Sequence, residues 1–272
     1  MWRVLTIILK TNENNKPIGF FDSGVGGLTV LSAFRSILPN EDCIFFGDTK
    51  NMPYGEKTKE QLIEYSTQAF MFFEQQNAKA VIMACNTTSA MVYDELKDKF
   101  NFKLYPLIQT VTQNIANMQI NKIGVFATPA TVESHAYAKN IKNFNDKIYI
   151  REIACPTWVK IVENGMKNSD ASYKNDIKIH MDEMTKFNPD KIVLGCTHYP
   201  YLIDILSQYA PIDKFINPAE IYAKEIKKDL TKNKMLNGSA RKGFDKFFVS
   251  DNPKKFVMSG KMFYEVKFCE CI

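Results

Sequence analysis

Two cysteines stand at the ends of apolar segments, and each is followed by polar residues. Cys85 lies in the segment Val81–Thr87, and Cys196 lies in the segment Ile192–His198. A thiol has a pKa of about 8.5, so both its protonated and its ionised form are accessible near neutral pH. Either cysteine could therefore give or take a proton as an acid or a base.

The segments around these cysteines belong to an internal repeat. Lys16–Ser23 resembles Asn121–Thr128, and Val81–Thr87 resembles Ile192–His198, in the same order and with similar spacing. One such match is common between apolar strands, whereas two matches in the same order indicate two related halves of the chain. A lone buried cysteine is most often a small core residue, and the repeat is what favours a functional role here.

A pair of opposed thiols suits the inversion of a stereocentre by proton transfer. The reaction needs a base on one face of the carbon and an acid on the other, because a single group would return the proton to the face it left. If the two halves pack with pseudo-twofold symmetry, Cys85 and Cys196 would face each other across an interdomain cleft. The polar residues that follow them, and free backbone N–H groups where a helix begins, could bind a carboxylate. His198 could also exchange a proton.

The rest of the chain predicts an α/β fold. Short apolar runs, each followed by a helical pattern, recur at Ile18–Phe21, Cys43–Phe46, Ala80–Ala84, Ile123–Phe126 and Lys191–Leu194. This alternation is typical of parallel sheets, and runs that are apolar throughout fit sheets covered on both faces. Functional side chains then belong at the carboxyl ends of the strands. We predict two similar α/β domains with mainly parallel sheets and an active site in the cleft between them.

A glycine-rich loop, Asp22–Gly27, follows the first predicted strand. Its glycines would let the backbone approach a ligand closely where a helix begins. The loop lacks the G-x-G-x-x-G and Walker patterns of nucleotide-binding loops, so a nucleotide site is disfavoured. Asp22 could act in the site, or it could only be the N-cap of the following helix.

The composition is that of a soluble globular protein. Of the 272 residues, 45% are hydrophobic and 24% are charged, and the net charge of +5 comes from scattered basic residues that do not demand a nucleic-acid partner. No apolar run approaches the roughly 18 residues of a membrane span. The segment Val4–Leu9 faintly resembles a secretory signal, but it is short and ends at Lys10. We expect a cytoplasmic protein with an N-terminal extension and no membrane partner.

The six cysteines are too sparse for a disulfide framework, so we interpret them as free thiols. Cys43 and Cys155 have no polar neighbours or repeat partner, and we place them in the core. Cys269 and Cys271 have no second close cysteine pair, and the chain has only three histidines, so no tetrahedral metal site is evident. We expect a frayed tail at these two residues and no bound metal.

Five motifs in this order make the chain resemble the glutamate racemase family over roughly residues 16–225. The motifs are Phe21–Val30, Gly47–Thr49, Pro53–Gly55, Ala84–Thr87 and Leu194–Pro200. With the repeat, the resemblance implies a first domain of residues 16–107 plus 218–272 and a second domain of residues 108–217. Residues 1–15 would be an N-terminal extension.

The resemblance also implies cofactor-independent interconversion of L- and D-glutamate, in which Cys85 removes the α-proton of D-glutamate and Cys196 that of L-glutamate. Asp22 would assist Cys85, and His198 would assist Cys196 with Glu163 as a further acid or base. Substrate binding would involve Asp22, Ser23, Pro53, Tyr54, Gly55, Asn86, Thr87, Thr128, Thr131, Thr197 and His198. Because the family usually forms dimers, we expect a homodimer. The resemblance also implies that the product D-glutamate would feed peptidoglycan synthesis in a bacterial cytoplasm.

Two segments depart from the family pattern. Ala127–Pro129 replaces a more usual Gly-Thr, and Leu107–Gln109 lacks a glycine that often follows the preceding strand. Three other functions are open: a racemase of aspartate or another amino acid, a catalytically silent amino-acid-binding module, and a pyridoxal-phosphate enzyme. The last is disfavoured because no lysine stands at a comparable strand end.

Overall fold

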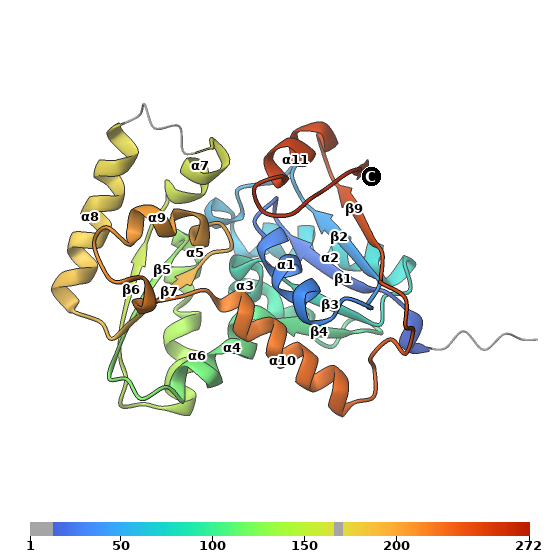
Figure 1. The fold of residues 1–272 in the computed structure, drawn as a ribbon, viewed down its shortest axis with the longest axis horizontal. Coiled ribbons are helices and arrows are strands. Elements are labelled where there is room, and N and C mark those ends of the chain that lie inside the picture. The colour runs from blue at the N-terminus through green and yellow to red at the C-terminus, as the bar shows by residue number, and fades with distance from the viewer. Residues whose placement is uncertain (1–12, 166–170) are drawn as a thin grey trace, which may run out of the picture.

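Two sheets with helices packed around them form the part of the chain described by the computed structural model, residues 13–165 and 171–272 (Figure 1). The strands are β1 (Ile18–Asp22), β2 (Cys43–Gly47), β3 (Ala80–Met83), β4 (Lys103–Pro106), β5 (Lys122–Ala127), β6 (Tyr149–Ala154), β7 (Lys191–Gly195), β8 (Phe215–Ile216), β9 (Asp245–Val249) and β10 (Glu270–Cys271).

The helices alternate with these strands along the chain. They are α1 (Leu28–Ile37), α2 (Lys59–Gln75), α3 (Asn86–Leu96), α4 (Leu107–Ala116), α5 (Pro129–Ser134), α6 (Ala136–Phe144), α7 (Trp158–Glu163), α8 (Ala171–Phe187), α9 (Ile203–Leu206), α10 (Pro218–Lys232) and α11 (Pro253–Gly260). Short 3-10 helices are η1 (Glu13–Asn15), η2 (Tyr54–Glu56), η3 (Tyr199–Leu202) and η4 (Ile212–Lys214).

The four strands of the second sheet follow the same order as four strands of the first. The first sheet is ordered β10-β9-β2-β1-β3-β4 and the second β6-β5-β7-β8, and the strand pairs of the described residues are parallel. β1 lies between β2 and β3 as β5 lies between β6 and β7, and the internal repeat relates β1 to β5 and β3 to β7. The predicted fold, two similar α/β halves with parallel sheets, is therefore confirmed.

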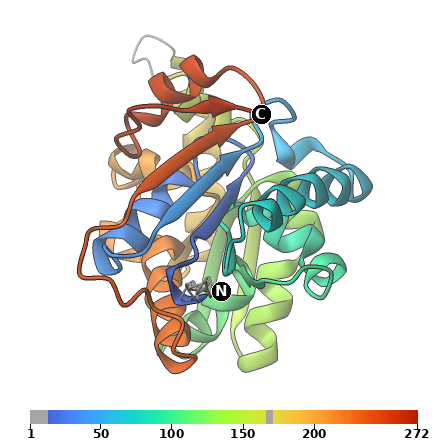
Figure 2. The same cartoon turned by 90° about the vertical axis from the view of Figure 1, so that its right-hand side faces the viewer.

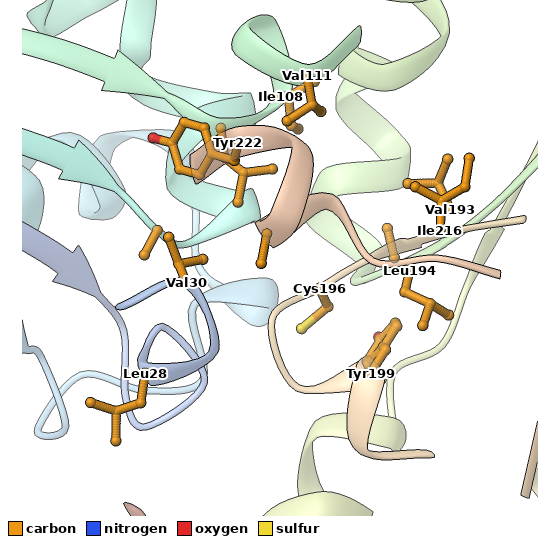
Figure 3. Packing of buried hydrophobic residues seen from close by; sticks show 14 of the residues in the cluster. Leu28, Val30, Ile108, Val111, Val193, Leu194, Cys196, Tyr199, Ile216 and Tyr222 are labelled. Atoms are coloured by element: carbon orange, nitrogen blue, oxygen red, sulfur yellow. The ribbon is translucent and has the colours of Figure 1, made fainter. Parts of the chain in front are cut away.

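The first sheet is covered by apolar side chains on both faces. Phe20 of β1 belongs to a large core cluster that reaches into the second half, whereas its neighbour Phe21 belongs to a second cluster against α2 and α3. Side chains alternate between the faces of a strand, so a run that is apolar throughout must be buried on both sides. The large cluster also holds Tyr222 of α10, which packs against α1 and α4 between the sheets (Figure 3).

The C-terminal segment differs from the expected frayed tail. β10 pairs with β9 at the edge of the first sheet, where β9 lies beside β2 (Figure 2). Phe263, Val266 and Cys269 are buried in the large core cluster, whereas Cys271 is exposed. The expectation was wrong because these three apolar side chains recur along one side of the segment and attach it to the core.

The predicted N-terminal extension, residues 1–15, lies outside the described residues except for η1. The division into residues 16–107 plus 218–272 and residues 108–217 stays a prediction. No helix in the described part of the chain is long and apolar enough to cross a membrane.

Candidate active site

Both cysteines of the repeat line one cavity between the two halves, with roughly 540 Å³ of space not filled by atoms, part of it open solvent. Cys85 and Cys196 are almost fully buried, with 6% and 7% of their surfaces exposed. The cavity is lined by Ser23, Met52, Pro53, Tyr54, Gly55, Glu56, Cys85, Asn86, Thr128, Pro129, Pro156, Val159, Lys160, Cys196, Thr197 and His198. The structure thus brings the two predicted thiols to one site.

The strand order explains why these residues meet. Asp22 ends β1, Cys85 follows β3 by two residues, and Cys196 directly follows β7. The carboxyl ends of parallel strands lie at the same edge of a sheet, where ligands usually bind. Figure 3 shows Cys196 in the turn after β7, next to the buried Leu194 and Tyr199. The cavity therefore lies where the functional edges of two sheets face each other.

On the Cys196 side, three groups form a hydrogen-bonded chain. The Cys196 Sγ lies 3.8 Å from His198 Nδ1, and His198 Nε2 lies 3.0 Å from Glu163 Oε1. Burial alone would lower the pKa of His198, but its hydrogen bonds to Cys196 and Glu163 raise that pKa to about 10. An imidazole in this position can carry the proton that Cys196 gives or takes.

On the Cys85 side, the neighbouring group is a buried carboxyl. Asp22 is 1% exposed; its Oδ1 accepts a hydrogen bond from the Gly24 N–H at 2.9 Å, and its Oδ2 has no partner. Burial raises the pKa of Asp22 to about 6. Burial and the charge of Asp22 raise the pKa of the Cys85 thiol to about 11. The thiol donates to Ser23 Oγ at 3.9 Å.

The glycine loop makes its close approach to the other half of the protein. A Cβ atom on Gly26 would lie 2.4 Å from Thr197 Oγ1 and 2.5 Å from the His198 ring, and one on Gly27 would lie 2.5 Å from Asp22 Cβ. These distances are far below van der Waals contact, so only glycine fits. Asp22 makes its hydrogen bond to Gly24 rather than a side-chain cap of α1, whose N-cap is Gly27.

Gly26→Ala is therefore expected to displace His198 and Thr197 from the cavity. We expect a loss of turnover of about 10²-fold or more, because misplacement of a reacting group by about 1 Å can cost that much. Steady-state kinetics of Gly26→Ala measures this loss of turnover. Gly238→Ala is the control, since a Cβ atom there meets no other atom within 4 Å. Equal turnover of the two variants would contradict this.

Three threonine hydroxyls join the halves at the wall of the cavity. Thr87 Oγ1 lies 2.9 Å from Thr128 Oγ1, which lies 3.0 Å from Thr131 Oγ1, and Thr131 Oγ1 donates to Thr87 Oγ1 at 3.3 Å. Thr128 also caps α5 by accepting from the Thr131 N–H, with Pro129 as the first residue of the helix. The departure Ala127–Pro129 thus still forms a regular helix start.

Asn86 faces the cavity at the start of α3. Its Oδ1 accepts a hydrogen bond of 2.7 Å from the hydroxyl of Tyr137 in α6. The amide group of Asn86 is therefore turned so that its N–H donors are available to an anion. The structure also reveals a role for Tyr137 that no sequence motif indicates, because this contact arises only when the two halves pack together.

The loop Pro53–Gly55 covers one side of the cavity. The Tyr54 hydroxyl donates to Asp48 Oδ2 at 2.5 Å, and Asp48 also accepts from Asn51 and from Ser250. Asp48 lies in one of the family-like motifs, Gly47–Thr49, but its part in holding this loop does not follow from the sequence.

The predicted site residues fall into two groups. Those that line the cavity are Ser23, Pro53, Tyr54, Gly55, Cys85, Asn86, Thr128, Cys196, Thr197 and His198. The other predicted site residues do not line the cavity, but each contacts or electrostatically affects a residue that does. They are Asp22, Glu163, Thr87 and Thr131. At the cavity wall, Lys160 of α7 forms an exposed ion pair with Glu56 of η2 at 3.0 Å.

Known proteins resemble this chain over nearly its whole length. Residues 29–226 match the family model described as Asp/Glu/Hydantoin racemase. The glutamate racemase of Thermoanaerobacter pseudethanolicus is 39% identical over 251 residues, which are 92% of this chain and 93% of that protein. This chain belongs to the glutamate racemase family.

Solved structures of family members share the whole fold. The crystal structure of glutamate racemase from Francisella tularensis in complex with D-glutamate has a TM-score of 0.88 and 35% identity, covering 95% of this chain and 98% of that one. Glutamate racemase isoform RacE1 from Bacillus anthracis has a TM-score of 0.89 and 28% identity, with the same coverage. The two-sheet architecture is therefore that of the glutamate racemase family.

Proposed function

We propose that this protein interconverts L- and D-glutamate by a two-base proton transfer between Cys85 and Cys196, without a cofactor. The observation that carries the proposal is that the two thiols line one cavity from opposite halves, each beside a different proton-transfer group. Inversion requires an acid and a base on opposite faces of the α-carbon, and this cavity supplies one of each.

In the D-to-L direction, the Cys85 thiolate removes the α-proton and the Cys196 thiol delivers its own proton to the opposite face. Asp22 accepts the proton that must leave Cys85 before the reaction, because it is the buried carboxyl next to that thiol. In the L-to-D direction, Cys196 is the base, and His198 takes its proton with Glu163 behind the ring. The catalytic residues proposed are thus Cys85, Cys196, Asp22, His198 and Glu163.

Substrate carboxylates would be held by donors at the ends of the strands. Cys85 is the N-cap of α3 and caps it with no side-chain hydrogen bond, so the first N–H groups of that helix are free for an anion. The Asn86 amide is turned by Tyr137, and the hydroxyls of Ser23 and Thr197 complete the lining. Pro53, Tyr54, Gly55 and the three linked threonines would shape the remaining wall.

Glutamate is favoured over aspartate because the relatives that cover nearly the whole chain are named glutamate racemases, one of them in complex with D-glutamate. A test uses protein freed of metals by a chelator and of pyridoxal phosphate by dialysis. It is incubated separately with D-glutamate and D-aspartate, and the enantiomers are separated by chiral chromatography. We expect L-glutamate to form at least about tenfold faster than L-aspartate, a difference of about 1.4 kcal/mol in transition-state binding. Faster turnover of aspartate, or none of glutamate, would refute the assignment.

We further propose that the enzyme works as a homodimer in a bacterial cytoplasm and supplies D-glutamate for peptidoglycan. The support is membership of the family. Light scattering of the purified protein over a range of concentrations tests the first point, and a mass of one chain at all concentrations would contradict it.

A further inference from the structure

Two of the buried polar atoms that lack hydrogen-bond partners belong to residues that influence Cys85. In the described part of the chain, the buried side-chain atoms without a partner are Asp22 Oδ2, Arg35 Nε, Ser66 Oγ and Thr88 Oγ1. Both residues influence Cys85: the charge of Asp22 raises the pKa of its thiol, whereas hydrogen bonding from Thr88 to the sulfur favours the thiolate and lowers that pKa. Leaving a buried hydroxyl without a hydrogen bond destabilises the fold, so its retention next to a reacting group calls for a function.

The helix geometry explains how Thr88 can reach the sulfur. Cys85 is the N-cap residue of α3 and has the extended backbone of that position, with φ −71° and ψ 123°. Thr88 is the third helical residue, whose backbone N–H normally donates to the N-cap side chain. Cys85 makes no such bond as a thiol. A thiolate is a far stronger acceptor than a thiol, so this capping position becomes useful when the cysteine ionises.

We propose that Thr88 is a further catalytic residue, which stabilises the Cys85 thiolate by donating hydrogen bonds from its Oγ1 hydroxyl and its backbone N–H. The proposal rests on the proposed role of Cys85 as a base. When Cys85 ionises, its S–H proton passes to Asp22 Oδ2, the S–H···Oγ contact with Ser23 is lost, and the sulfur accepts the Thr88 hydrogen. When the thiolate takes the α-proton of D-glutamate, it becomes a thiol again and Thr88 is released.

The charges around Cys85 agree with this role. Among the described residues, the titratable groups coupled most strongly to it are Asp22 from β1, Tyr54 from η2 and Cys196 across the cavity. The cavity is also lined by His198, Lys160 and Glu56. Burial is the largest influence and raises the pKa of the Cys85 thiol, and the charge of Asp22 raises it further; a hydrogen bond that the sulfur accepts from the Thr88 hydroxyl or backbone N–H lowers it, because such a bond favours the thiolate. Among these neighbours, Thr88 is thus a neutral donor that favours the ionised form.

At the equivalent position of the second half, the hydroxyl is not available to the thiol. In the internal repeat, Thr88 corresponds to Tyr199, three residues after Cys196. The Tyr199 hydroxyl is already used, since it donates to the backbone carbonyl of Cys155 at 2.9 Å. Cys196 has His198 instead, at 3.8 Å. The two thiols are therefore stabilised by different devices, a hydroxyl and helix N–H on one side and an imidazole on the other.

The test compares Thr88→Val, which keeps the shape and removes the hydroxyl, with Thr88→Ser, which keeps the hydroxyl. Both are made in a Cys196→Ala, Cys271→Ala background, and the rate of Cys85 alkylation by iodoacetamide is measured against pH. Loss of a hydrogen bond to a charged group is expected to raise the midpoint by about one pH unit in Thr88→Val, because the thiolate becomes less stable. Thr88→Ser should stay near the parent.

Ser66→Ala is the matched control, because it removes another buried hydroxyl without a partner, on α2. It should leave both the alkylation midpoint and kcat/KM unchanged. Thr88→Val should unfold at the same or a higher temperature than the parent, since an unsatisfied polar group is removed, while its kcat/KM with Cys196 present falls about tenfold. Thr88→Ala, which also lacks the hydroxyl, should shift the midpoint in the same direction as Thr88→Val.

An unchanged midpoint in Thr88→Val, or an equal shift in Thr88→Ser, would overturn the proposal. The alkylation measurement needs no substrate, so it separates this inference from the proposed function. If Thr88→Val raises the alkylation midpoint but the parent protein does not racemise glutamate, the role of Thr88 is supported and only the proposed substrate is refuted.

Discussion

Replacing either Cys85 or Cys196 with alanine is expected to lower kcat for glutamate racemisation by about 10³-fold or more, within the range of a lost general acid or base. Each direction uses one thiol as base and the other as acid, so neither half of the reaction survives the loss of one sulfur. Because the two enantiomers have equal free energy, kcat/KM must fall equally in both directions.

Cys271→Ala is the control, because this thiol is exposed and does not line the cavity. It should keep full activity, and all three variants should show the circular dichroism spectrum of the parent. Substantial turnover by Cys85→Ala or Cys196→Ala would contradict the two-base mechanism. A loss of activity together with loss of the folded spectrum would instead show that the sulfur is needed for packing.

The second large effect is expected from Asp22→Asn, which should lower activity by about 10²-fold and at the same time stabilise the fold. Burial raises the pKa of Asp22 from 3.8 to about 6. Between these values the folded state binds more protons than the unfolded state, so Asp22 makes stability fall as the pH rises through this window. A shift of this size corresponds to a loss of about 3 kcal/mol in the free energy of unfolding at pH values above this window.

Urea unfolding of the parent and of Asp22→Asn at pH 4 and pH 8 measures this effect. The variant should gain stability mainly at pH 8, because an amide carries no charge to bury. Asp48→Asn is the contrasting control, since the Asp48 carboxylate accepts hydrogen bonds from Tyr54, Asn51 and Ser250 and its replacement should destabilise the protein. If Asp22→Asn were less stable than the parent at pH 8, the carboxylate would be a structural group instead.

Much of this fold follows from local sequence pattern. Apolar runs such as Ala80–Ala84 predict strands within about two residues, because a strand buried on both faces must be apolar throughout. β6 is not predicted, since it is an edge strand that exposes Tyr149 and Arg151 and lacks such a run. β8 and β10 are two residues long, which is too short for any periodicity to be visible.

Some residues of the site can also be predicted from the sequence, and others cannot. The repeat places Cys85 and Cys196 at equivalent strand ends, so their meeting in one cavity can be predicted without coordinates. The sequence pattern does not reveal the roles of Tyr137, Asp48 and Thr88. These roles depend on side chains that become neighbours only when the chain has folded. A hydrogen bond such as that of Tyr137 to Asn86, or the lack of one at Thr88, leaves no periodic signal in the chain.

The central claim, that two thiols act on opposite faces of one carbon, is tested most directly by the fate of the α-hydrogen in deuterated water. D-Glutamate bearing ordinary hydrogen at Cα is incubated with the enzyme, and both enantiomers are analysed by mass spectrometry at low conversion. With Cys196 exchanged to its deuterated thiol, the first L-glutamate formed should carry deuterium, while the remaining D-glutamate keeps its hydrogen. L-Glutamate that retains the original hydrogen would show transfer by a single base and would contradict the two-thiol mechanism.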